Sequence, residues 1–192
     1  MSTAAGGVSE LGEEQRAQLA LMPSSPPTCG ATLSPCGVYR YRLWRNVVSF
    51  HTHHVPGRVA LFIMLNPSQA DENADDPTIR RCVSFATREG CGRLEVVNLY
   101  AFRATEPREM FAAHDPVGPF NDEHIALAVH QARASGGLVI VAFGADPRAW
   151  ERWERVRCTL DGGETWCFGT TKSGQPRHPL FVRRDEPLAR WT

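Results

Sequence analysis

Seven consecutive apolar residues, Val59 to Leu65, constrain the fold of this chain most, and they stop at Asn66-Pro67-Ser68. A run of this length without polar alternation is typical of a strand that is buried on both faces. Such strands occur in parallel sheets that helices cover on both sides. We therefore expect an α/β domain in which residues 66–68 follow the carboxyl end of a central strand.

Further apolar segments follow at intervals that suit strands joined by helices. They are residues 94–99, 138–143 and 165–168. Asp76-Pro77 and Asp146-Pro147 each combine a capping side chain with a proline at the first helical position, and Asn121 is a third candidate cap. The alternation predicts a doubly wound α/β sandwich with a short central parallel sheet and right-handed crossovers.

The N-terminal part of the chain has a different texture. Aromatic and aliphatic residues alternate with arginines from Tyr39 to Arg45, which predicts an edge hairpin whose second strand lies near residues 47–51. Residues 1–36 are rich in Ser, Gly, Pro and Ala, so we interpret them as a mostly flexible extension. Residues 37–192 then form a single α/β domain.

Charge and hydropathy restrict the function classes. The 192 residues include 21 basic and 21 acidic side chains, and this zero net charge argues against a protein that coats nucleic acid through bulk charge. The zero is an average, because residues 37–58 and 171–184 are basic while residues 71–76 are acidic. No apolar run reaches the roughly 20 residues of a membrane span, and no signal peptide is recognisable. We expect a cytoplasmic protein with no membrane partner.

The candidate site lies just beyond the carboxyl ends of the strands, where doubly wound sheets bind their ligands. The chain contains no glycine-rich dinucleotide or P-loop motif and no GxSxG elbow. Asp75 and Asp76 fit helix capping better than metal binding, and His51 and His53 lack a third ligand nearby. We therefore expect neither a cofactor nor a metal.

Short motifs in a fixed order carry a resemblance to known proteins. Leu65-Asn66-Pro67-Ser68, Val97-Asn98-Leu99, the strand 138–144 and His178-Pro179-Leu180-Phe181 resemble the motifs of the uracil-DNA glycosylase superfamily. Residues 36–182 more closely resemble a bacterial and phage domain family of unknown function. That closer resemblance rests on Tyr39-Arg40-Tyr41, on residues 75–81 and on residues 171–178.

The glycosylase resemblance implies an enzyme that flips a base out of double-stranded DNA and hydrolyses its N-glycosidic bond. It implies that Asn66 holds the attacking water and that His178 donates to the base as negative charge develops on it. Asn98 would hydrogen-bond the edge of the base, with Ser68 and Gln69 beside it. The fold expected on this ground is that of the uracil-DNA glycosylases.

The resemblance also implies DNA contacts. Leu180 and Phe181 stand where the superfamily has an apolar wedge that fills the space of the flipped base, although the two residues could instead belong to the last core strand. Basic residues near this motif and in the N-terminal hairpin are candidates for phosphate contacts. They are Arg40, Arg42, Lys172, Arg177, Arg183 and Arg184.

The substrate expectation rests on Ser68. Uracil-specific members of the superfamily have a tyrosine at this position that excludes pyrimidines with a substituent at C5, whereas serine leaves room. We therefore expect a monomer that excises a modified pyrimidine, hydroxymethylated or glucosylated as in phage DNA, in anti-phage defence.

Two alternatives stay open: a module that binds a nucleobase or nucleotide without cleavage, and a hydrolase of free modified nucleosides. The acidic residues 71–76 favour a small ligand if they close the pocket.

Overall fold

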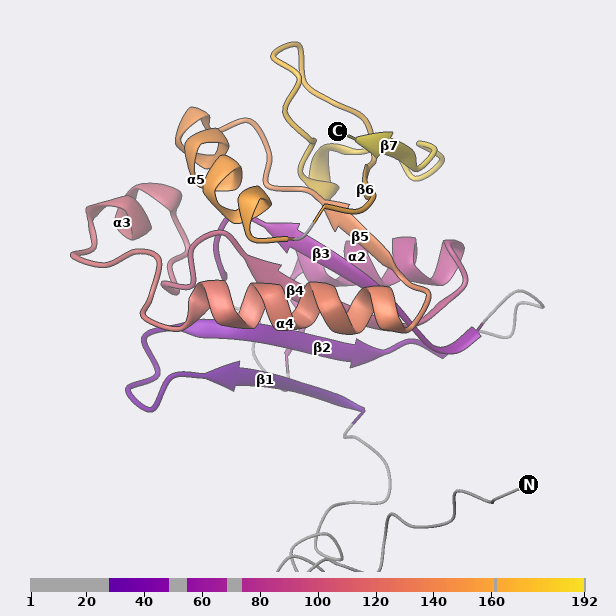
Figure 1. Cartoon of the computed structure of the whole chain (residues 1–192), viewed down its shortest axis with the longest axis horizontal. Helices are drawn as coiled ribbons and strands as arrows, with labels where there is room; N and C mark the ends of the chain where they lie inside the picture. Colours follow the sequence, from indigo (N-terminus) through magenta and orange to yellow (C-terminus); the bar gives the residue numbers. More distant parts are fainter. Residues whose placement is uncertain (1–27, 49–54, 69–73, 161, 192) are drawn as a thin grey trace, which may run out of the picture.

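The computed structural model describes residues 28–48, 55–68, 74–160 and 162–191. Within them a seven-stranded mixed sheet has the order β1-β2-β4-β3-β5-β6-β7 (Figure 1). The strands are β1 (Cys29–Leu33), β2 (Arg40–Asn46), β3 (Val55–Met64), β4 (Cys91–Asn98), β5 (Leu138–Val141), β6 (Thr165–Cys167) and β7 (Ala189–Trp191). Neighbours from β4 through β6 run parallel, and β1, β2 and β7 are antiparallel to their neighbours. The α/β class is confirmed, and the sheet is mixed.

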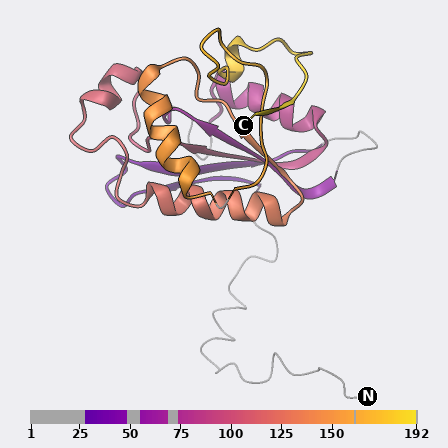
Figure 2. The same ribbon diagram turned by 45° about the horizontal axis from the view of Figure 1, so that its top comes forward.

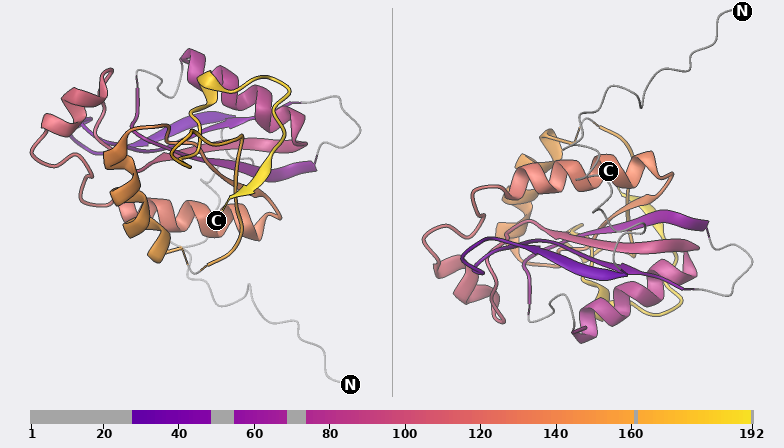
Figure 3. Two further views of the ribbon diagram at one scale, coloured as in Figure 1. Left: turned by 90° about the horizontal axis from the view of Figure 1, so that it is seen from above. Right: turned by 90° about the horizontal axis from the view of Figure 1, so that it is seen from below.

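Helices cover both faces of the sheet (Figure 3). α2 (Pro77–Arg88) packs on one face, and α4 (Asn121–Ala134) and α5 (Pro147–Cys158) pack on the other. α3 (Pro107–Ala112) precedes α4, and the 3-10 helix η1 (Pro179–Phe181) lies against α2 (Figure 2). No helix in the described part of the chain is long and apolar enough to cross a bilayer.

β3 lies at the centre of the sheet, as the apolar run predicted. Ile63 pairs with Val97 of β4 on one side and with Val141 of β5 on the other, and residues 59–65 are all buried. After β3 the chain passes through α2 to β4, and then through α3 and α4 to β5 on the opposite side of β3. The loops that follow β3 and β5 therefore diverge, which opens a crevice between the two strand ends.

Two of the three expected helix caps are confirmed. The Asp76 carboxylate accepts from the Ile79 N–H at 2.8 Å, and the Asp146 carboxylate accepts from the Arg148 N–H at 2.9 Å. Asn121 behaves differently, because it is the first helical residue and it is buried. Its Nδ2 donates to the backbone carbonyls of Asn98 and Leu99, both at 3.0 Å. The Asn121 side chain therefore attaches the start of α4 to the end of β4.

The N-terminal boundary of the domain lies earlier than expected. Residues 29–33, within the segment interpreted as a flexible extension, form β1 and pair with β2. Gly30 lies under the Trp44 ring, where an added Cβ would stand 2.3 Å from Trp44 Cζ2, so close packing explains how a glycine-containing segment joins the sheet. Val47 and Val48 form no strand, and the rest of the predicted second strand lies outside the described residues, as do His51 and His53.

Candidate active site between the ends of β3 and β5

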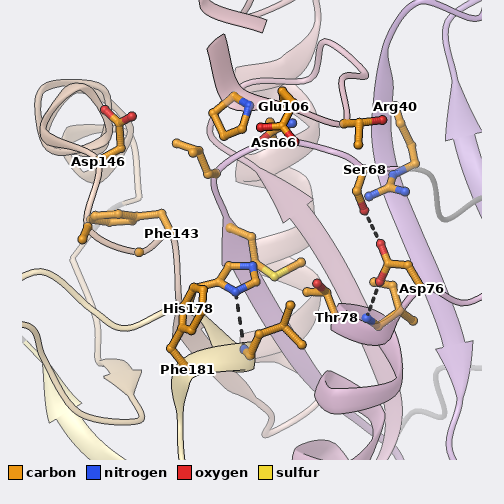
Figure 4. Close-up of a pocket in the computed structure, with 18 residues that line it drawn as sticks. Arg40, Asn66, Ser68, Asp76, Thr78, Glu106, Phe143, Asp146, His178 and Phe181 are labelled. Carbon is orange, nitrogen blue, oxygen red and sulfur yellow. Dashed lines mark hydrogen bonds between the residues drawn. The ribbon is translucent and has the colours of Figure 1, made fainter. Parts of the chain in front are cut away.

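A pocket of about 570 Å³ occupies the crevice between the ends of β3 and β5. Its walls come from the segments that follow these two strands, from the start of α2, from the start of α3 and from η1. The polar side chains that line it are Arg40, Asn66, Ser68, Asp76, Thr78, Thr105, Glu106, Asp146 and His178. All of them except Thr105 are labelled in Figure 4. The structure therefore brings the two predicted catalytic residues into one pocket.

Asn66 has a fixed orientation in this pocket. Its Nδ2 donates to the carbonyl of Ala104 at 2.9 Å and to the carbonyl of Pro67 at 3.1 Å. Because two carbonyl acceptors fix the position of the amide NH₂, the assignment of Oδ1 follows from the network. The Oδ1 atom is thereby left as an acceptor, which is the group needed to orient a water molecule.

His178 is held in one tautomer. It precedes η1, and its Nδ1 accepts from the Leu180 N–H at 3.4 Å, so in the neutral ring the proton resides on Nε2. Burial lowers the pKa of His178, and the nearby Asp76 carboxylate opposes this effect only in part. The ring lines the pocket (Figure 4). His178 therefore offers an uncharged N–H donor.

Ser68 and Asp76 form one wall together with Arg40. The Ser68 hydroxyl donates to the Asp76 carboxylate, which also caps α2, and the Arg40 guanidinium is drawn next to both side chains (Figure 4). Arg40 is only 1% exposed. A guanidinium buried to this extent cannot contact phosphates at the protein surface, so the expectation of a phosphate contact at Arg40 is corrected. It adds a positive charge to the pocket wall instead.

Asn98 is placed behind the pocket rather than in its wall. It is 1% exposed at the end of β4, paired in register with Met64, which does line the pocket. Neither amide atom of its side chain has a hydrogen-bond partner within the described residues. The structure therefore does not bring Asn98 to the pocket. Gln69, the other candidate beside the base, lies outside the described residues.

Leu180 and Phe181 lie at the rim of the pocket and are exposed by 46% and 79%. They form a 3-10 turn and not a core strand, which decides between the two interpretations of this segment. A leucine and a phenylalanine that project from a pocket rim present an apolar surface to whatever enters. Their role as a wedge stays a prediction.

The remaining basic candidates occupy different surroundings. Arg42 bonds Glu95 and Gln131 of α4, so it lies on the α4 face and is not brought to the pocket. Arg177 is exposed and donates to the carbonyl of Thr170 at 2.9 Å, and Lys172 is exposed in the neighbouring turn. Arg183 pairs with Asp185 at 3.2 Å. Arg184 is exposed beside α2.

Glu106, Phe143 and Asp146 line the pocket although the motifs did not single them out as site residues. Glu106 is exposed at the start of α3, and Asp146 has a pKa lowered by hydrogen bonds from Arg148. Both acids directly precede a proline at the start of a helix, as Asp76 does. This repeated acid-proline pair is the sequence pattern from which they could have been predicted as site residues. Phe143 adds an aromatic ring to the pocket wall on the side of His178 (Figure 4).

These features define an α/β protein with a ligand-sized, largely apolar pocket that carries several polar side chains at the switch point of a mixed sheet. Residues 40–180 match the family described as "Protein of unknown function (DUF1643)", and the chain belongs to this family. No curated protein and no solved structure matches the chain. The matched range runs from Arg40 to Leu180 and so includes nearly all of the pocket.

Proposed function

We propose that this protein is a DNA glycosylase of the uracil-DNA glycosylase type that hydrolyses the N-glycosidic bond of a flipped-out, modified pyrimidine and leaves an abasic site. One observation carries the proposal: Asn66 and His178 line one pocket with a fixed acceptor and an uncharged donor. Hydrolysis of this bond needs both groups, because water must be oriented on the sugar side and negative charge must be stabilised on the base side.

The proposed reaction follows from the two groups. The oxygen of a water held by Asn66 Oδ1 bonds to C1′ while the C1′–N bond breaks and its electron pair passes to the base. Nε2–H of His178 hydrogen-bonds the base as this negative charge develops, and a preorganised donor of this kind contributes about 3 kcal/mol. The water gives up one proton, and the released base finally takes up a proton.

Glu106 is the proposed acceptor of the proton that the water loses. An asparagine can orient a water molecule but cannot take its proton at neutral pH. Glu106 lines the same pocket, and Asn66 is anchored through the Ala104 carbonyl to the segment that leads into Glu106. A general base typically contributes a factor of about 10² to 10⁴ in rate.

The size of the pocket supports a base with a large substituent. Its volume of about 570 Å³ is within the range of pockets that hold whole organic ligands. Ser68 occupies little of the wall and turns its hydroxyl to Asp76. We infer that hydroxymethylated or glucosylated pyrimidines are the substrates, and because such bases mark phage DNA, the proposed setting is anti-phage defence.

The test is a panel of duplexes that are identical except for one base: uracil, 5-hydroxymethylcytosine or glucosylated 5-hydroxymethylcytosine. Released bases are identified by mass spectrometry, and abasic sites are revealed by alkaline strand cleavage. We expect release of the substituted bases, with loss of product in Asn66→Ala and His178→Ala. Release of uracil alone would refute the substrate assignment, and release of no base would refute the glycosylase.

The second candidate is a hydrolase of free modified nucleosides. Asp76, Glu106 and Asp146 all line the pocket, and three carboxylates there would repel a DNA phosphate near the mouth. The same modified nucleosides supplied free in solution distinguish the two enzymes. Cleavage of free nucleosides without cleavage of the duplex favours the second candidate, and saturable binding of nucleosides without cleavage of either favours a binding module.

A further inference from the structure

One side of α2 carries basic and hydroxyl side chains without an acid. The helix contains three arginines and no acidic residue over its twelve positions. Arg80, Arg81, Ser84, Thr87 and Arg88 follow the three- and four-residue spacing of a single helix side. They line two adjoining hollows of about 580 and 280 Å³, and Arg184 borders both. We call this surface, made by these five residues and Arg184, the α2 groove.

The α2 groove is continuous with the candidate active site. Leu180 lines both the pocket and the first hollow, while Ser84 and Arg184 line both the first hollow and the second. A chain that left the pocket across Leu180 would therefore run directly along α2. Twelve residues of helix span about 18 Å, and one strand of B-DNA carries a charge for about every 3.4 Å of axis. The groove is long enough for several phosphates.

The charge of the groove is only partly balanced by the described residues. None of the residues that line the two hollows is acidic. Among acids nearby, Glu89 pairs with Arg88, Asp185 pairs with Arg183 and Asp75 pairs with Arg45. Across the described ranges, no acidic side chain forms an ion pair with Arg80, Arg81 or Arg184.

α5 provides the contrast within the same fold. It has the same length as α2, but its exposed arginines have acidic partners in or next to the helix: Arg148 pairs with Asp146, Arg155 with Glu151 and Arg157 with Glu154. A helix of this kind is an ordinary solvated surface. α2 differs at Arg80 and Arg81, which donate to the backbone carbonyls of Asp75 and Val182 and form no ion pair within the described residues, whereas Arg88 pairs with Glu89 and also donates to the carbonyl of Arg184. Such bonds orient the guanidinium groups without neutralising their positive charge.

We propose that the α2 groove binds the sugar-phosphate backbone of the DNA strand whose base enters the pocket. The choice of DNA rests on the proposed function, and the phosphate chemistry rests on the arginines. Guanidinium groups present paired donors that match phosphate oxygens. Leu180, between the pocket and the groove, would separate the flipped nucleotide from its neighbours. The phosphate contacts thus come from α2 and Arg184, in place of the Arg40 and Arg42 expected from the sequence.

The experiment measures the binding of a fluorescent duplex without modified bases, by anisotropy, between 50 and 200 mM KCl. The double variant Arg80→Gln/Arg184→Gln is expected to bind at least about tenfold more weakly at the lowest salt, with a log–log salt slope shallower by about 2. Arg80→Lys/Arg184→Lys should keep most of the slope because it keeps the charge. The control Arg155→Gln/Arg157→Gln removes the same charge from α5 and should change affinity less than about twofold.

Several outcomes would overturn the proposal. They are an unchanged slope in Arg80→Gln/Arg184→Gln, an equal loss in the α5 control, and the absence of measurable DNA binding by the parent protein at 50 mM KCl. Binding of phosphatidylserine vesicles that depends on Arg80 and Arg184, without DNA binding, would assign the groove to a membrane surface and would also overturn it. Since the duplex contains no substrate base, the result is independent of whether the protein proves to be a glycosylase.

Discussion

The backbone N–H of Leu180 donates to Nδ1 of His178 at 3.4 Å, so the residue at the pocket rim sets the tautomer of the ring inside the pocket. One turn of 3-10 helix thereby couples the exposed apolar rim to the proposed electrophilic donor. Movement of Leu180 upon DNA binding would act directly on the ring of His178.

His178 is expected to titrate below its ordinary value of 6.5, because burial lowers its pKa. The unfolded chain then binds more protons than the folded one between the two values, so the free energy of unfolding falls as the pH drops below 6.5 toward the folded pKa. Long-range ¹H–¹⁵N spectra of the imidazoles, assigned with His178→Gln, should show Nε2–H and this low pKa. A ring protonated on Nδ1, or a pKa above 6.5, would contradict the assignment.

Asn66→Asp is expected to destabilise the protein. The substitution replaces a donor with an acceptor against the carbonyls of Ala104 and Pro67, so two hydrogen bonds become repulsive contacts. We expect the free energy of unfolding in urea to fall by about 1–3 kcal/mol. Asn46→Asp, at an exposed position on β2, is the matched control and should change stability by less than about 0.5 kcal/mol. Equal effects at both positions would show that the Asn66 bonds do not stabilise the fold.

Asp76→Ala removes the cap of α2 and the partner of Ser68 together. A lost cap costs about 1 kcal/mol, which corresponds to a fall in Tm of about 2–4 °C in a domain of this size. Asp146→Ala removes the equivalent cap of α5 without touching Ser68. We expect calorimetry to show a loss of Tm in both variants. Asp76→Ala should in addition weaken substrate binding because Ser68 loses its acceptor, whereas Asp146→Ala changes a different wall of the same pocket. An unchanged substrate affinity in Asp76→Ala would argue against a role of Asp76 in the pocket.

Glu106→Gln tests the proposed proton acceptor. The side chain keeps its size but can no longer take a proton, so single-turnover base release should slow by about 10² to 10⁴. Binding of the substrate duplex should stay equal or improve, because a negative charge leaves the pocket. Glu109→Gln removes the same charge from the next turn of α3, outside the pocket wall, and should leave the rate unchanged. If both variants are as fast as the parent protein, another group accepts the proton.

Ser68→Tyr tests the substrate assignment by filling the pocket. A tyrosine ring beside Asp76 would occupy the space that Ser68 leaves for a substituent at C5. Release of a glucosylated base should fall at least tenfold in this variant, while release of uracil from an otherwise identical duplex should stay the same or rise. Undiminished release of the glucosylated base would place the substituent on another side of the pocket.

The sequence predicted the centre of the fold well, because burial on both faces leaves an unmistakable apolar run at residues 59–65. Asp76-Pro77 and Asp146-Pro147 likewise located the starts of α2 and α5 through local chemistry. β1 was not predicted, since a strand of only five residues near prolines carries little pattern. Its pairing with β2 and the close packing of Gly30 against Trp44 become visible only in the folded chain. The role of Asn121 was also missed because its partners lie on β4.

For the candidate site, the sequence predicted which residues come together better than it predicted the direction in which their side chains point. Residues after the ends of β3 and β6 could be placed near one another from strand order, so Asn66 and His178 were expected together. Which way a side chain points within a strand depends on bulges, and β1 and β2 are irregular next to Arg40. Arg40 consequently points into the protein while Arg42 contacts α4. Asn98 is buried at the end of β4, and β3 separates that strand from β5 and from the crevice between β3 and β5.

The two walls of the pocket are separated widely along the chain, since residues 64–68 lie at and just after the end of β3, whereas Phe143, Asp146 and His178 come much later. Contacts of such long sequence separation form late and slowly during folding. The first β-α-β unit, β3-α2-β4, cannot build this pocket by itself. A nascent or proteolysed chain that has completed only that unit would lack Phe143, Asp146 and His178, so the proposed reaction would require the chain at least through η1.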